Sequence, residues 1–180
     1  APAPELDAIL RAGDRAQQYL AALRSVGTVP AARQRTDSHA FVAALADTAN
    51  ALCRPAKLHF VLQEQWQGQF LCAAPELSRA LENMLDNAVR YTPAGGTVTL
   101  TISKADGDVA FTVTDTGPGF TPEALHKAGQ FLYTDAARPG NGHQGLGLYL
   151  ARSVAQAYGG KLVLANTGIG AQAQLCLPMQ

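Results

Sequence analysis

The sequence predicts an α+β fold, in which helices pack on one face of a single mixed, mostly antiparallel sheet. The order of the segments is the first reason: helices, a hairpin, a further helix and a second hairpin. Composition is the second, because hydrophobic residues make up 47 % of the 180 residues, enough for the core of one domain. The third is glycine placement, since 14 of the 17 glycines lie between Gly95 and Gly170 and indicate a loop-rich second half.

The first half of the chain predicts helices separated by short extended segments. A stripe of apolar residues indicates a helix over 5–24, and a linker or a single short strand follows over 27–35. We expect Ser38 to be the N-cap of a helix over 39–53, which Pro55 ends.

Two short strands are expected next, over 58–62 and 70–73. Pro75 suits the first turn of a helix, and leucines at helical spacing extend this helix over 75–91. It stops before Pro93, because proline cannot continue the helical hydrogen bonding.

The second half predicts two hairpins around one long helix. Threonines alternate with Val98, Leu100 and Ile102 in a half-buried strand, and Asp106-Gly107 turns the chain into a second strand that ends at Asp115. The remaining expected elements are a loop over 116–144 with one short helix after Thr121-Pro122, a helix over 145–158 closed by Gly159-Gly160, and strands over 162–164 and 171–177.

Charge and cysteine usage exclude several classes of protein. Lys and Arg number 14 and Asp and Glu number 14, and a chain with no net charge is not a general nucleic-acid binder. The cysteines, Cys53, Cys72 and Cys176, lie in apolar contexts without metal-ligand spacing, which predicts buried thiols and a reducing compartment. No apolar run reaches the roughly 18 residues of a membrane span, and no signal-peptide pattern is present, so we expect a soluble chain.

The first candidate site lies on the helix over 75–91. Asn83, Asn87 and Arg90 fall within a sector of roughly 60°, away from the apolar stripe. One interpretation is a solvated helix face. The other is a polar stripe that faces phosphates and a metal, because an Asn oxygen suits Mg²⁺ and Arg neutralises phosphate charge.

Two further candidates follow in the second half. Asp115 is followed by Gly117 and Gly119. Its carboxylate can accept a hydrogen bond from an adenine amino group, and the two glycines let a ligand approach the backbone without a clash with a Cβ. The alternative interpretation is an ordinary turn. The glycine-rich segment 140–148 then enters a helix, a pattern typical of anion binding. It is not a Walker A motif, because no Lys-Ser/Thr follows, and no preceding strand supports a Rossmann fingerprint.

Together these segments resemble the GHKL ATPase superfamily, and most closely the catalytic ATP-binding domain of sensor histidine kinases. Residues 83–93 resemble its N box, 115–119 its first glycine box, 131–134 its F box and 142–148 its second glycine box. The resemblance covers about residues 36–178. It implies a two-layer α/β sandwich, the Bergerat fold, over 29–180. Residues 1–28 would be the end of a dimerisation and phosphoacceptor helical hairpin, with its linker. The alternative, an N-terminal helix unrelated to such a hairpin, also remains open.

The resemblance implies a role for each matching residue. Asn87 would ligate Mg²⁺, Asn83 would support the phosphates or the metal, and Arg90 would contact phosphate. Asp115 would bind the adenine amino group, and Tyr91 would pack against adenine. Residues 121–143 would form a mobile ATP lid with Arg138 as a γ-phosphate contact, so the implied catalytic set is Asn83, Asn87, Arg90 and Arg138. The other implied ATP contacts are Gly117, Gly119, Phe120, Gln144, Gly145, Leu146, Gly147 and Leu148.

The implied activity is transfer of the ATP γ-phosphate to a histidine on a separate dimerisation helix, for relay to a response regulator. The implied partners are therefore the protein's own dimerisation domain, in a homodimer, and a response regulator. None of His39, His59, His126 and His143 lies in an acceptor-type sequence, so we expect this chain to lack the acceptor. The domain would be cytoplasmic, and an inner-membrane anchor in the full-length protein stays open.

Two alternatives remain beside the kinase. One is a degenerate nucleotide-sensing interaction domain without kinase activity. The other is a GHKL ATPase of the chaperone or DNA-repair type, in which a Glu four residues before Asn87 would activate water. This chain has Asn83 there, and a carboxamide is a poor base, which disfavours efficient hydrolysis.

Overall fold

The computed structural model describes residues 32–130 and 146–179 of the chain. The helix expected over 5–24 and the domain boundary expected after residue 28 lie outside these residues. So do Arg138, Gln144, Gly145, the F-box segment 131–134 and His143. The helices and strands expected from residue 39 onward lie wholly or almost wholly within the described residues.

A five-stranded sheet in the order β2-β4-β5-β7-β6 forms one layer of the molecule. Its strands are β2 (His59–Glu64), β4 (Thr97–Ala105), β5 (Asp108–Asp115), β6 (Lys161–Asn166) and β7 (Ala171–Pro178). Strands β2 and β4 are parallel and the other neighbours are antiparallel. The mixed, mostly antiparallel sheet predicted from the sequence is thus confirmed.

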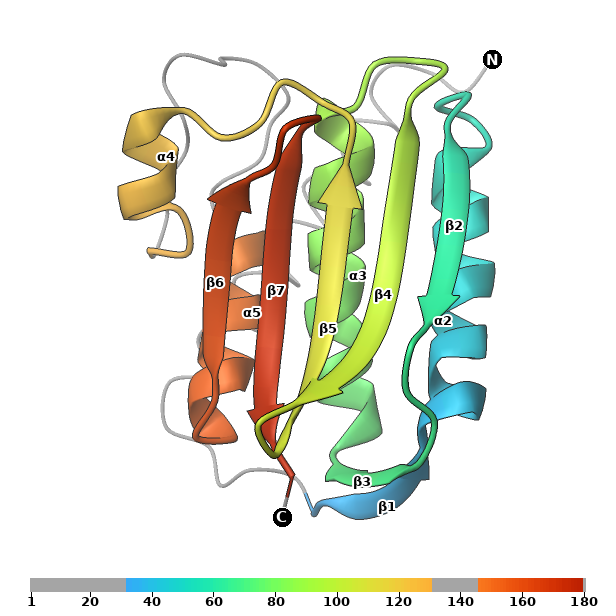
Figure 1. The fold of residues 1–180 in the computed structure, drawn as a ribbon, viewed down its shortest axis with the longest axis vertical. Helices are drawn as coiled ribbons and strands as arrows, with labels where there is room; N and C mark the ends of the chain where they lie inside the picture. The colour runs from blue at the N-terminus through green and yellow to red at the C-terminus, as the bar shows by residue number, and fades with distance from the viewer. Residues whose placement is uncertain (1–31, 131–145, 180) are drawn as a thin grey trace, which may run out of the picture.

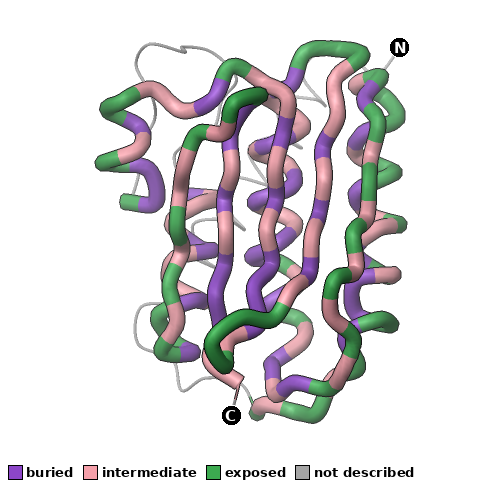
Figure 2. The backbone as a smooth tube through the Cα atoms, in the orientation of Figure 1, coloured by how far each residue is buried: buried purple, intermediate pink, exposed green. Residues whose placement is uncertain are grey.

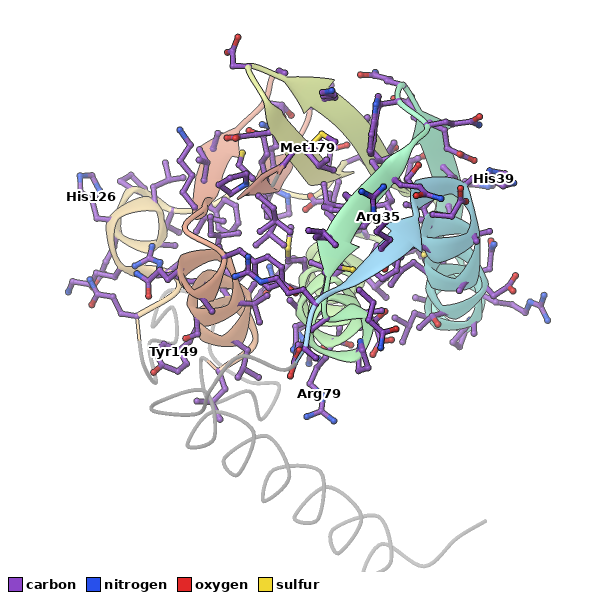
Figure 3. The ribbon with its side chains drawn as sticks, turned by 90° about the horizontal axis from the view of Figure 1, so that it is seen from below. Arg35, His39, Arg79, His126, Tyr149 and Met179 are labelled. Carbon is purple, nitrogen blue, oxygen red and sulfur yellow. The ribbon has the colours of Figure 1, made fainter. Side chains whose placement is uncertain are left out.

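Three helices form the second layer, and all three lie on the same face of the sheet (Figure 1). They are α2 (Ser38–Cys53), α3 (Ala74–Tyr91) and α5 (Gly147–Ala157). The short helix α4 (Pro122–Lys127) lies beyond the β6 edge. The view from below shows the same two layers (Figure 3), so the predicted two-layer arrangement with helices on one face is correct.

The core lies between the layers, and strand alternation explains its composition. Val98, Leu100 and Ile102 of β4 are each 0 % exposed, because they point toward the helices while the intervening threonines point outward. Buried residues recur along the central strands and the inner sides of the helices (Figure 2). Phe111 of β5 is the aromatic centre, with ring centroids 5.8 Å from Phe41 and 5.7 Å from Phe70.

A second, two-stranded sheet closes the lower end of the molecule in Figure 1. It pairs β1 (Gln34–Asp37) antiparallel with β3 (Gln69–Cys72). The sequence left open a linker or a single short strand over 27–35; residues 27–31 lie outside the described part of the chain, and strand β1 begins within the expected range, at Gln34. Its pairing lets β3 bury Phe70, which is 5 % exposed, under the aromatic cluster.

The N-cap predicted for α2 was wrong by one residue. Asp37 caps the helix, because its Oδ1 accepts from the Ala40 amide at 2.9 Å. Ser38 is the first helical residue and is 0 % exposed, and its hydroxyl accepts from the Gly68 amide instead. Both residues are good N-caps, so only the tertiary contact to Gly68 decides between them.

The other boundaries agree to within a few residues. Helix α3 begins one residue before Pro75 and ends at Tyr91, followed by Thr92, which is 7 % exposed and donates its hydroxyl to Ala88 O at 2.6 Å. Strands β2 and β6 extend further than the apolar runs predicted, because sheet pairing continues through polar positions.

Candidate functional site

Helix α3 adjoins both of the other candidate motifs. An ideal Cβ built on Gly147, at the start of α5, would lie 3.6 Å from Asn83 Oδ1 on α3. A Cβ built on Gly117, just after β5, would lie 2.7 Å from the Tyr91 carbonyl oxygen at the end of α3. Helix α3 therefore contacts the start of α5 at Asn83 and the aspartate turn at Tyr91.

Asp115 is the buried charged residue of this region. It ends β5 and is 6 % exposed. Its Oδ1 accepts from the Gly117 amide at 2.8 Å and from the Ala171 amide at 3.3 Å. Two backbone amides, one in the turn after β5 and one at the start of β7, thus orient one oxygen of this buried carboxylate.

The two glycines after Asp115 are required for different reasons. At Gly117 a Cβ would meet Tyr91 O at 2.7 Å and Asp115 Oδ1 at 2.9 Å, and the first of these is backbone that cannot turn away. Gly119 has φ +75°, which disfavours any residue with a side chain. The backbone here comes closer to its neighbours than any residue with a Cβ would allow.

The structure also identifies residues that the sequence did not single out. Asn166, at the end of β6, donates Nδ2 to Phe120 O at 2.9 Å and accepts from the Phe120 amide at 2.6 Å. Gly170 lies so close to the Asp115 backbone that a Cβ there would collide with the Asp115 carbonyl. The glycine is a weak sequence signal for close approach, whereas no local pattern indicates that Asn166 reaches a residue 46 positions away.

The predicted stripe on α3 is partly exposed, while the opposite face of the helix is buried. Asn83 donates to the Arg79 carbonyl at 2.9 Å. Arg90 forms an ion pair with Asp86, with Nη2 and Oδ2 2.7 Å apart. Asn87 is also partly exposed on this side. Because Asn83 faces the start of α5, the stripe is not simply a solvated helix face.

The start of α5 offers backbone donors. Leu146 is the N-cap residue, and a leucine has no polar atom to accept from the amides of the first turn. Leu146 is 2 % exposed and packs with Leu150, which anchors this helix end. Leu148 is partly buried against the main core. The helix start adjoining Asn83 is thus electropositive and lacks side-chain capping.

Three buried thiols and one exposed histidine have raised pKa values. Burial raises the pKa of the Cys53, Cys72 and Cys176 thiols, so none of them is a ready nucleophile. The Glu64 carboxylate, which accepts a hydrogen bond from His39 Nδ1 at 2.9 Å, raises the pKa of His39. His39 and His126 lie at opposite edges of the molecule (Figure 3).

Over residues 32–130 and 146–179, no three His, Cys, Asp or Glu side chains gather where they could hold a metal ion. Within the same ranges, no helix is both long and apolar enough to cross a membrane.

Comparison with known families gives one matching model over most of the chain. A family model described as "Histidine kinase-, DNA gyrase B-, and HSP90-like ATPase" matches residues 72–180. This range contains all of the α3, Asp115 and α5 segments that meet at the site.

Curated relatives that match are named as sensor kinases. The sensor histidine kinase SpaK of Bacillus subtilis is 41 % identical over 107 residues, covering 58 % of this chain and 23 % of SpaK. The histidine protein kinase DivJ of Caulobacter vibrioides is 36 % identical over 105 residues, covering 57 % of this chain and 18 % of DivJ. The sensor protein QseC of Escherichia coli K12 is 40 % identical over 94 residues, covering 52 % of this chain and 20 % of QseC. The matched part spans about a fifth of each relative's length.

Solved structures share the fold. The mycobacterial sensor histidine kinase MprB superposes with a TM-score of 0.72 at 24 % identity, covering 82 % of this chain and 99 % of that one. The Acinetobacter baumannii histidine kinase AdeS superposes with a TM-score of 0.78 at 19 % identity, covering 97 % of this chain and 82 % of the AdeS chain. At these identities the likeness establishes the architecture, a mixed sheet with helices on one face.

Proposed function

The chain belongs to the family of histidine kinase-, DNA gyrase B- and HSP90-like ATPases, and we propose that it binds Mg²⁺-ATP and transfers the γ-phosphate to a histidine outside this chain. One observation supports the proposal. Helix α3 contacts the glycine turn after the buried Asp115 through Tyr91 and the start of α5 through Asn83, so all three predicted segments adjoin the same helix. The relatives named as sensor histidine kinases support a histidine acceptor.

The residues present fit an adenine base. Asp115 Oδ1 is already oriented by two backbone amides, and a carboxylate held in this way is a fixed acceptor for an exocyclic amino group. The missing side chain of Gly117 lets the turn pack directly against the end of α3 and the Asp115 carboxylate, which brings Tyr91 and Asp115 to the same place. Tyr91, partly exposed at the end of α3, is the proposed packing partner of the base.

The residues present also fit a magnesium triphosphate. Carboxamide oxygens of Asn87 and Asn83 are hard ligands of the kind Mg²⁺ prefers, together with phosphate oxygens and water. Arg90, held by Asp86, is the proposed phosphate contact. The uncapped amides at Gly147 and Leu148 provide donors for phosphate oxygens. Arg138, Gln144 and Gly145 are proposed to complete this set from residues that the structure does not describe.

The bound nucleotide supplies the phosphoryl group, and the metal neutralises charge on its oxygens. The chain's contribution is to orient the triphosphate and to exclude water as the acceptor. Asn83 stands where a hydrolysing relative would need a carboxylate base, and its amide nitrogen is already bonded to Arg79 O. Phosphoryl transfer is therefore favoured over hydrolysis.

The proposed partners follow from this reaction. The acceptor would be a histidine on a dimerisation helix, in a homodimer of the full-length protein, and a response regulator would receive the phosphate. We further propose that residues 1–28 belong to that hairpin and its linker, and that the domain functions in the cytoplasm.

The first experiment is calorimetry with a non-hydrolysable ATP analogue, with and without Mg²⁺. We expect binding that Mg²⁺ strengthens and that Asp115→Asn weakens by roughly ten-fold or more, because the variant replaces acceptor capacity with an amide donor. Asp47→Asn, on the exposed side of α2, is the matched control and should bind normally. No binding at millimolar nucleotide would overturn the proposal.

The second experiment tests transfer. The chain is mixed with a separately prepared acceptor hairpin and labelled ATP, and we expect acid-labile label on the hairpin and none on this chain. Binding without transfer would instead favour a nucleotide-sensing interaction domain. Steady turnover of ATP by the chain alone would favour a hydrolysing ATPase.

A further inference from the structure

A single hairpin holds both ends of the Asp115 turn. Strands β6 and β7 pair so that Asn166 faces Ala171. The Ala171 amide donates to Asp115 at the start of the turn, and the Asn166 carboxamide bonds to Phe120 at its end. Figure 1 shows the loop that leaves β5 passing over the ends of β7 and β6 on its way to α4.

The contact between Asn166 and Phe120 resembles one rung of a β-ladder made by a side chain. One carboxamide accepts from the Phe120 amide at 2.6 Å and donates to the Phe120 carbonyl at 2.9 Å. Among side chains of this length, only a carboxamide offers an acceptor and a donor side by side. The fit is close, because an ideal Cβ on Gly119 would lie 2.8 Å from Asn166 Oδ1.

The hairpin tip beyond Asn166 is itself stiffened. The Thr167 amide donates to Gly170 O at 2.7 Å, and the Thr167 hydroxyl accepts from the Gly170 amide at 3.0 Å. On the other side of Phe120, the Thr121 hydroxyl caps α4 by accepting from the Ala124 amide at 3.1 Å. Asn166 therefore joins a rigid hairpin to the residue that separates the Asp115 turn from α4.

We propose that Asn166 is a positioning residue for recognition of the adenine base. It holds the far end of the 115–120 turn, so that the Asp115 carboxylate and the Gly117 backbone keep the relative placement proposed to contact the base. This inference rests on the proposed function, because it assigns a residue to the same nucleotide site. The contact also sets where the segment that leads into α4 departs from that site.

Three variants separate positioning from simple loss of stability. Asn166→Ala removes both hydrogen bonds, and we expect roughly ten-fold weaker binding of the ATP analogue. Asn166→Asp keeps the acceptor for the Phe120 amide, but an ionised carboxylate cannot donate to the Phe120 carbonyl. Asn50→Ala is the matched control, because Asn50 bonds only locally on α2, to Ala46 O at 2.9 Å, far from the site.

Acidification distinguishes the two site variants. A protonated aspartic acid regains a donor, so binding by Asn166→Asp should recover toward wild type as the pH falls toward the acid range of a carboxyl group, near pH 4–5. Asn166→Ala should show no such recovery. The wild type and Asn50→Ala, measured over the same range, correct for the titration of the nucleotide itself.

Selectivity for the base completes the test. Asn166→Ala should lose more affinity for the ATP analogue than for a triphosphate whose base lacks the exocyclic amino group. An equal loss for both nucleotides, or no pH-dependent recovery in Asn166→Asp, overturns the positioning role. So does unchanged binding by Asn166→Ala. If the wild type itself binds no nucleotide, the proposed function fails, and this inference fails with it.

Discussion

At the scale of single residues, the site depends on glycines whose missing side chains make room for neighbours. Gly117 and Gly170 both adjoin Asp115, one beside its carboxylate and the Tyr91 carbonyl, the other beside its backbone. Gly119 instead supplies a backbone conformation with φ +75°. Sequence alone indicates that glycines gather here, but their separate reasons come from neighbours distant in the chain.

Gly117→Ala tests the close-approach argument. The new methyl would meet Tyr91 O at 2.7 Å, so the turn must move and carry the Asp115 bond with it. We expect roughly ten-fold weaker binding of the ATP analogue by calorimetry, together with a lowered melting temperature. Gly168→Ala is the matched control, because no atom lies within 4 Å of the Cβ that it adds. Equal behaviour of the two variants would contradict the role assigned to Gly117.

At the scale of elements, helix ends decide where functional segments begin. Helix α3 runs from its proline-containing first turn to Tyr91, and its buried face is the one that its leucines predict. Helix α5 starts at Gly147 beside Asn83, and its N-cap residue Leu146 makes no side-chain cap. Helix α2, in contrast, has a full side-chain cap, as expected of an element with a structural role.

Asp37→Ala tests the corrected cap of α2. Loss of the 2.9 Å bond to the Ala40 amide should lower the free energy of unfolding by about 1 kcal/mol, measured by chemical denaturation. Asp47→Ala, within the same helix on its exposed side, should change it much less. A larger loss in the free energy of unfolding for Asp47→Ala than for Asp37→Ala would contradict the assignment of Asp37 as the N-cap.

At the scale of the whole molecule, residues before the family-matched range complete the core. The family model begins at residue 72, yet Phe41 of α2 and Phe70 of β3 pack on Phe111 in the central strand. Arg33, near the start of the described chain, lies 4.2 Å above the ring of Tyr158 and donates to Ala157 O at 2.8 Å. Arg33 is thereby attached to the end of α5 that is opposite Gly147.

Phe111→Ala tests this shared core. Phe111 is 0 % exposed and contacts aromatic rings from two other elements, so its truncation should cost about 3–5 kcal/mol in the free energy of unfolding. Ile169→Ala, at a position 71 % exposed on the β6–β7 turn, is the control and should stay near wild type. Denaturation curves for both variants measure the difference, and a small effect at Phe111 would mean that the aromatic cluster is not the centre of the core.

The sequence by itself determined the fold class, the element order, the three segments of the site and the family they resemble. These are local properties, because the periodicity of apolar residues and the placement of glycines within a segment indicate its secondary structure and its buried face. Only the tertiary structure decided that β1 pairs with β3, that Asp37 and not Ser38 caps α2, and that Asn166 holds Phe120. Each of these depends on a contact between segments separated along the chain, such as the 46 positions between Phe120 and Asn166. No local pattern records such a contact, because its partner is chosen by packing of the whole core.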